Sequence, residues 1–208
     1  MAKHKVKQGE CISSIAEQYG LFPNALWNQP ENSQLKRRRK NPNVLFPSDE
    51  LFIPERQEKS EKGSTEQLHR FRKRGVPAKL RVRIQRNNKT IADAEYTLEI
   101  ESNIYEGWTD PDGWIEESIH PGARKGKLIL RAGHRQFNLQ LGYLDPIDEL
   151  SGVQARLKNL GFDPGPIDGK MGPRTQAALR EFQESHELKQ SGRENEETMK
   201  LLQELHGA

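Results

Sequence analysis

A short pattern that occurs twice in the last quarter of the chain constrains its fold more than any other feature. Each copy has a turn residue followed by Gly, then Gly or Asn three positions after that Gly, and then Thr three positions further on. The two copies are Asp168, Gly169, Gly172 and Thr175, and Ser191, Gly192, Asn195 and Thr198. Gly and Asn adopt left-handed backbone angles at low cost, so we expect Gly172 and Asn195 to reverse the chain. Each copy precedes an amphipathic stretch, which predicts a small helical module.

Apolar residues around the two copies recur at helical spacing. They form three sets, namely Val153, Leu157 and Leu160, then Ala178 and Phe182, then Met199, Leu202 and Leu205. Gly161 suits a helix end, and Pro173 suits a first helical turn. The spacing therefore predicts three helices that share one core.

The order of these turn and core residues closely resembles the three-helix peptidoglycan-binding domain. The resemblance covers about residues 149–206 and is carried by Val153 to Phe162, Pro164 to Gly169, Gly172 to Thr175, Ala177 to Leu179, and Phe182 with Gln183. It implies binding to peptidoglycan, and the ligand-contacting residues that we expect are Phe162, Asp168, Gly169, Lys170, Met171, Gly172, Arg174 and Thr175.

Two interpretations of the charged residues in this turn stay open. A helix N-terminus favours an anion, and Arg174 could pair with a stem-peptide carboxylate there. Alternatively, Asp168 only caps its own turn and Arg174 is solvated.

The first 54 residues form a second unit. A strand and turn are expected over residues 6–10, a helix over residues 11–19 with Gly20 at its end, and a closing strand over residues 51–54. The two ends together resemble a LysM domain, a βααβ fold that binds N-acetylglucosamine-containing glycans. The resemblance is carried by His4 to Glu10, Ser13 to Gly20 and Pro47 to Pro54. The glycan-binding residues that it implies are Gly9, Glu10, Cys11, Ile12, Val44, Leu45, Phe46 and Pro47.

This unit departs from the LysM pattern at three places. Cys11 follows Glu10 where Thr is usual, and Ser48 follows Pro47 where Gly is usual. A basic run over residues 36–40 is inserted before the closing strand. The run is interpreted either as a solvated helix end or as a contact for phosphate or a wall carboxylate.

The middle of the chain has a different pattern. Residues 55–67 are polar and charged throughout, which predicts a flexible linker. Residues 68–145 contain several short stretches with strand periodicity, including residues 80–85, 94–100, 127–131 and 135–141. Their spacing predicts a small β-sandwich. The turn over residues 107–113 is similar to transthyretin-like or carboxypeptidase-regulatory-like sandwiches.

Composition limits the function classes. The net charge is +3, which favours an anionic polymer without requiring nucleic acid. One cysteine allows no disulfide within the chain and no Cys-based metal site. We expect no nucleic-acid partner and no membrane span, because aromatic residues do not accompany the basic run and no apolar stretch is long enough. The N-terminal residues have no apolar run, so we expect synthesis in the cytoplasm and action at the periplasm or cell wall after delivery.

No catalytic, metal or cofactor site is expected from the sequence. The histidines lack metal-protease spacing. Asp110 and Asp112 could join Asp93 or Glu117 around calcium, but Asx turns explain them without a metal. A pair of carboxylates suited to glycoside hydrolysis cannot be recognised among 30 acidic residues.

The sequence therefore predicts a multidomain α+β protein. Its expected units are a LysM-like βααβ module (1–54), a linker (55–67), an antiparallel β-sandwich (68–145) and a three-helix peptidoglycan-binding domain (146–208). The expected function is non-enzymatic attachment to peptidoglycan through glycan and stem peptide, with a protein partner on the sandwich. This module order resembles accessory proteins of type VI secretion or phage-tail-like contractile machines. The alternative is a peptidoglycan hydrolase whose catalytic centre lies in the middle domain.

Overall fold

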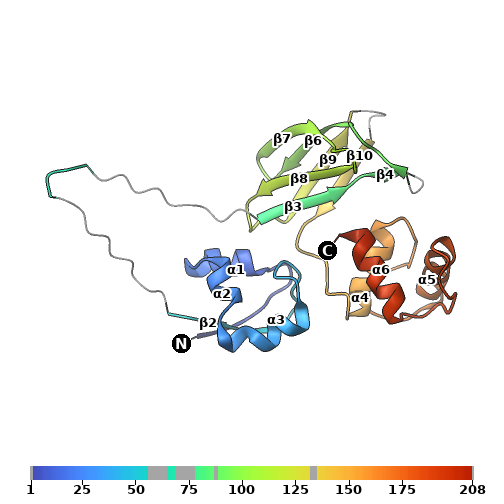
Figure 1. Ribbon diagram of the computed structural model, residues 1–208, viewed down its shortest axis with the longest axis horizontal. Coiled ribbons are helices and arrows are strands. Elements are labelled where there is room, and N and C mark those ends of the chain that lie inside the picture. The colour runs from blue at the N-terminus through green and yellow to red at the C-terminus, as the bar shows by residue number, and fades with distance from the viewer. Residues whose placement is uncertain (1, 56–64, 69–77, 87–88, 132–134, 208) are drawn as a thin grey trace.

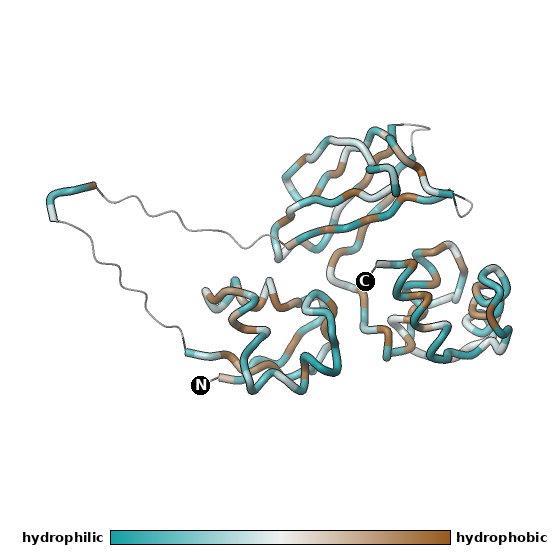
Figure 2. The backbone as a smooth tube through the Cα atoms, viewed as in Figure 1, coloured by the Kyte–Doolittle hydropathy of each residue, from teal (hydrophilic) through white to brown (hydrophobic). Residues whose placement is uncertain are grey.

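The computed structural model describes residues 2–55, 65–68, 78–86, 89–131 and 135–207. Three groups of elements each surround a hydrophobic cluster of their own (Figure 1). Apolar and polar segments alternate along the backbone in all three groups (Figure 2). Most of the expected linker, residues 56–64, lies outside the described ranges. Within them, no helix is long and apolar enough to cross a membrane.

The N-terminal module has two antiparallel strands, with helices between them in the chain. Strand β1 (Ala2–Lys5) pairs with β2 (Glu50–Ile53). The intervening helices are α1 (Ile12–Tyr19), α2 (Pro23–Trp27), η1 (Pro30–Asn32) and α3 (Ser33–Arg39). We expected the first strand within residues 6–10, but β1 ends before them, at Lys5. Gly20 ends α1 in a left-handed conformation, as expected.

One residue of the basic run, Arg39, departs from the interpretation of a solvated helix end. The run forms the last turn of α3 and the residue that follows it, and the side chain of Arg39 is fully buried. The Arg39 guanidinium contacts Asp49 through Nε at 2.8 Å and Nη2 at 3.0 Å. The prediction of a solvated side chain was therefore wrong for Arg39. A buried guanidinium is tolerated where carboxylates compensate its lost hydration, and Asp49 does so here.

The central domain consists of antiparallel sheets that share one core. A four-stranded sheet has the order β10–β9–β6–β7, and β3 pairs with β8. The strands are β3 (Ala78–Arg83), β6 (Glu95–Ile100), β7 (Asn103–Trp108), β8 (Trp114–Ile119), β9 (Lys125–Leu130) and β10 (Arg135–Gln140). The short strands β4 (Gln85–Arg86) and β5 (Lys89–Thr90) pair with each other, and residues 87–88 of the expected hairpin turn lie outside the described ranges.

The core of the central domain follows from period-two alternation. Tyr96, Leu98 and Ile100 on β6 are buried, and they share one cluster with Leu128 and Leu130 on β9. The β3–β8 pair adds its own apolar side chains to the same cluster. Burial of one face of each sheet explains why the alternation was visible in the sequence.

The C-terminal domain contains three helices, as the apolar spacing predicts. They are α4 (Leu150–Asn159), α5 (Pro173–Ser185) and α6 (Glu196–His206). Val153, Leu157, Phe182 and Leu202 belong to their common core. Pro173 is the first residue of α5, where its missing N–H costs no helical hydrogen bond.

Candidate functional site

A buried glutamine holds the turn in front of α5. Gln154 on α4 is 1% exposed, and its Oε1 accepts the N–H groups of Asp168 (3.1 Å) and Gly169 (2.9 Å). Its Nε2 donates to Lys170 O at 3.1 Å and to Thr175 Oγ1 at 3.1 Å. One side chain therefore satisfies several otherwise orphaned backbone groups of the turn.

The second copy of the repeat has the same construction around Gln183 on α5. Gln183 Oε1 accepts the Gly192 N–H at 2.9 Å, and Nε2 donates to Arg193 O (2.9 Å) and Thr198 Oγ1 (3.0 Å). Both glutamines lie within the stretches that carry the sequence resemblance, but the sequence predicts no role for them. Their positions on the preceding helices, ahead of Gly and Thr, were the signal that would have found them.

The left-handed residues of the repeat are not those that we expected. Gly169 and Gly192 have φ values of 70° and 64°. Gly172 and Asn195 instead have extended N-cap conformations, with φ values of −90° and −136°. A helix N-cap requires an extended backbone, so the chain must reverse earlier, at the glycine after the turn residue.

An exposed surface remains on the outside of the first turn. Asp168, Gly169, Lys170 and Arg174 are exposed, and Ile167 is 47% exposed. Asp168 Oδ1 accepts the Lys170 N–H at 2.9 Å and also contacts Gln154. The backbone and Gln154 hydrogen bonds lower the pKa of the Asp168 carboxyl. Asp168 thus caps its own turn and remains anionic at neutral pH.

Arg174 has an internal partner that the sequence did not predict. Its Nη2 donates to Asp163 Oδ2 in an ion pair that is exposed on both sides. Asp163 also accepts the Gly165 N–H at 3.0 Å, and this bond together with Arg174 lowers the pKa of the Asp163 carboxyl. A ligand carboxylate would therefore compete with Asp163 for the guanidinium.

The other expected contacts in this domain serve packing. Thr175 is 2% exposed, and its Oγ1 donates to Pro164 O at 3.0 Å. Phe162 packs edge-on against Phe182 with ring centroids 5.4 Å apart, and Met171 lies against the same core. The site is best described as an exposed surface over residues 163–174 on a rigid internal scaffold; we call it the first-turn surface.

The expected glycan-binding residues of the N-terminal module lie at one end of that module. The Ile12 N–H donates to Pro42 O at 2.9 Å, which joins the turn before α1 to the loop that leads toward Pro47. Gly9, Ile12, Val44 and Leu45 are buried. Glu10, Cys11, Phe46 and Pro47 are half-buried.

Glu10 belongs to a small polar network beneath this turn. His4 Nε2 lies 2.7 Å from Glu10 Oε2, and His4 Nδ1 lies 3.1 Å from the Tyr19 hydroxyl. Burial opposes ionisation of Glu10, but the hydrogen bonds from His4 and the Lys7 N–H lower its pKa overall. Glu10 is thus engaged inside the module.

The turn of the central domain is held by an Asx arrangement. Asp110 Oδ1 accepts the N–H groups of Asp112 (2.9 Å) and Trp114 (2.7 Å). Gly113 completes the turn with a φ of 75°. Across the described part of the chain, no group of three or more His, Cys, Asp or Glu side chains is placed to hold a metal ion.

Comparison with known proteins identifies the C-terminal domain. Residues 140–202 match the family described as "Putative peptidoglycan binding domain", so this region is a peptidoglycan-binding domain. The chain is also 49% identical over 52 residues to "Putative OxPP cycle protein OpcA" of Nostoc punctiforme (strain ATCC 29133 / PCC 73102). That similarity covers 25% of this chain and 11% of the Nostoc protein. No solved structure matches the chain.

Proposed function

We propose that this chain is a non-enzymatic adaptor that attaches to bacterial peptidoglycan. The peptidoglycan-binding domain at residues 140–202 supports attachment to the cell wall. The observation that carries the proposal is the first-turn surface, where Lys170, Arg174 and Ile167 are exposed on a turn fixed by buried Gln154. Cationic and apolar groups on a rigid turn suit a stem peptide, which offers both carboxylates and small apolar side chains.

The N-terminal module supplies the second attachment in this proposal. Its strand–helix–strand order supports the LysM resemblance. We place its glycan site at the turn from Gly9 to Ile12 and the loop from Val44 to Pro47, where Glu10, Cys11, Phe46 and Pro47 are half-buried. Two weak sites on one chain raise the avidity for a repeating polymer. Glycan would bind to the N-terminal module, and stem peptide to the C-terminal domain.

The adaptor role requires a protein partner, which we place on the central domain. Strand β7 lies at an edge of the four-stranded sheet and exposes Ile104 (68%) and Trp108 (65%). Delivery by a type VI secretion-like or phage-tail-like machine is part of the proposal and rests on the order of the modules alone.

Sedimentation with insoluble peptidoglycan tests the proposal. The chain should pellet with purified sacculi while the supernatant gains no soluble muropeptides above a buffer control. Failure to pellet would contradict attachment. Muropeptide release would favour the hydrolase alternative, and Asp110→Asn and Asp112→Asn would show whether the central turn is responsible.

A further inference from the structure

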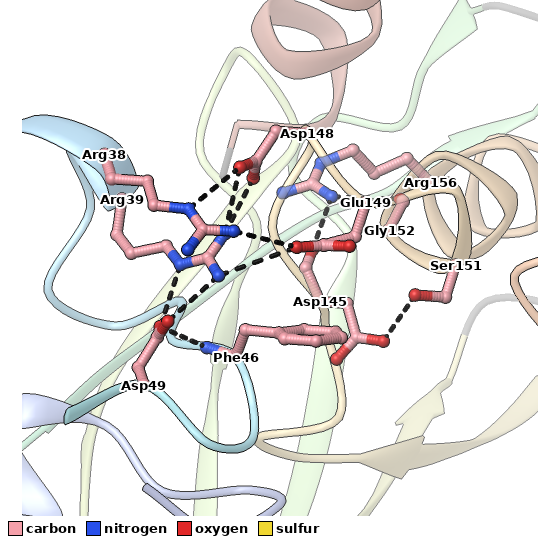
Figure 3. Close-up of polar contacts among 10 residues, drawn as sticks. All are labelled: Arg38, Arg39, Phe46, Asp49, Asp145, Asp148, Glu149, Ser151, Gly152 and Arg156. Carbon is pink, nitrogen blue, oxygen red and sulfur yellow. Dashed lines mark hydrogen bonds and ion pairs between the residues drawn. The ribbon is translucent and has the colours of Figure 1, made fainter. Parts of the chain in front are cut away.

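Two arginines of the N-terminal module contact the start of the C-terminal domain (Figure 3). Arg39 Nη1 lies 3.0 Å from both carboxylate oxygens of Asp148, and Nη2 lies 3.6 Å from Glu149 Oε1. Arg38 adds longer contacts to Asp148 (3.8 Å) and Glu149 (3.5 Å). The contact joins residues that are 109 positions apart in the chain.

The Arg39 guanidinium has one partner within its module, Asp49, and two outside it, Asp148 and Glu149. Its Nε and Nη2 engage Asp49, which belongs to the same module and is 8% exposed. Its Nη1 engages Asp148, whose side chain is 45% exposed. Release of Asp148 would leave the buried Arg39–Asp49 pair intact, so the contact can open without stranding a buried charge.

Three further contacts hold the same module in place. A Cβ added at Gly142 would lie 2.6 Å from Gly9 O, so the two backbones touch. A Cβ added at Gly9 would lie 3.1 Å from Arg124 Nε of the central domain. Glu17 on α1 also pairs with His120 Nε2 at 3.3 Å.

The contacts of Gly9 fall on the expected glycan-binding end of the module. Gly9 is buried and lies against Gly142 and Arg124. Phe46 lies under the Arg39 guanidinium, 5.5 Å from its ring centroid, and its N–H donates to Asp49. The docked position therefore covers part of the surface that a glycan would occupy.

We propose that Asp148 and Glu149 form a docking surface for the N-terminal module of the same chain, and that docking closes the glycan-binding end of that module. Glycan then binds only to the released module. Charge complementarity selects this occupant, because Arg38 and Arg39 face two carboxylates. The closing of the glycan site rests on the proposed function, whereas the docking contact does not.

The test uses the full chain with Asp148→Asn and Glu149→Gln combined. The matched control is Glu181→Gln with Glu184→Gln, which removes the same charge from exposed positions on α5. Small-angle scattering should show a larger radius of gyration for the docking variant and not for the control. Affinity for a soluble N-acetylglucosamine oligomer should rise about tenfold if the released state is a tenth populated in the wild type.

Each outcome has a separate meaning. An unchanged radius of gyration would overturn the docking surface. Expansion without any change in oligomer affinity would overturn the closing of the glycan site. Sedimentation velocity of the wild type should give a monomer, and a dimer that the variant dissociates would mean that a second copy occupies the surface instead. Pelleting with sacculi through the C-terminal domain reports on the proposed function independently and should persist in the variant.

Discussion

Gln183 occupies, at the second turn of the C-terminal domain, the place that Gln154 occupies at the first. Each amide oxygen accepts the N–H of the left-handed turn glycine at 2.9 Å. Each amide nitrogen donates to the threonine in the first turn of the following helix, at 3.1 and 3.0 Å. The repeat in the sequence is thus a repeat of one hydrogen-bonded device, in which a helix organises the turn that leads to the next helix.

Replacing either glutamine should destabilise the domain strongly. Gln154→Ala or Gln183→Ala would leave buried backbone groups without partners, at a cost of about 2–4 kcal/mol in the free energy of unfolding. Urea unfolding measures this, with exposed Gln190→Ala as a control that should change little. If the free energy of unfolding falls no more than in the control, the glutamine hydrogen bonds make no net contribution to stability.

Removing Arg174 and removing Asp163, the two members of the ion pair on the first-turn surface, should have opposite effects on peptidoglycan binding. Arg174→Ala should weaken peptidoglycan binding without lowering the melting temperature, because the pair is exposed. Asp163→Asn should strengthen binding, because it frees the guanidinium for a ligand carboxylate. Co-sedimentation isotherms compare the variants, and wild-type binding by Arg174→Ala would place the ligand elsewhere.

The lowered pKa of His206 predicts that the free energy of unfolding falls in mild acid. Burial and the nearby charge of Arg156 lower the pKa of His206 to about 4, below its ordinary value near 6.5. Between these values the unfolded chain binds the extra proton, so stability should fall as pH drops from 6.5 to 4. The loss is on the order of 3 kcal/mol. Thermal melts across this range should show it, and the slope should diminish in His206→Gln.

The basic run divides into two classes of residue. Lys36→Gln, Arg37→Gln and Lys40→Gln should leave the melting temperature nearly unchanged, because these side chains are exposed. Arg39→Gln should destabilise by about 3–5 kcal/mol, because Asp49 would be left buried without its partner. Calorimetry separates the classes, and a neutral Arg39→Gln would contradict the buried pair.

The spacing of apolar residues predicted the helices and strands, because an element that buries one face carries apolar residues at the period of that element. Val153, Leu157 and Phe182 pack as their spacing indicates, and the strands of the central domain follow their period-two alternation. What periodicity cannot predict is which polar residue turns inward. Gln154 and Arg39 are polar residues whose burial depends on partners placed by the fold.

The candidate site was predicted only in outline. Asp168 and Lys170 lie on the first-turn surface as expected, but Thr175 is a buried scaffold residue and Asp163 was missed. The pairing of Arg39 with Asp148 joins residues 109 positions apart, and no local pattern encodes such a contact. Charge in a sequence indicates solvation by default, and only the fold reveals the exception.

The most direct measurement of the central claim is a nuclear magnetic resonance titration of the isotope-labelled full chain with soluble muropeptides. The account predicts that backbone amide shifts change in a saturable manner and cluster over residues 163–174. They should change little along α6, which lies outside the first-turn surface in the sequence. Saturable binding whose shifts avoid residues 140–202, or no binding at all, would contradict attachment through the peptidoglycan-binding domain.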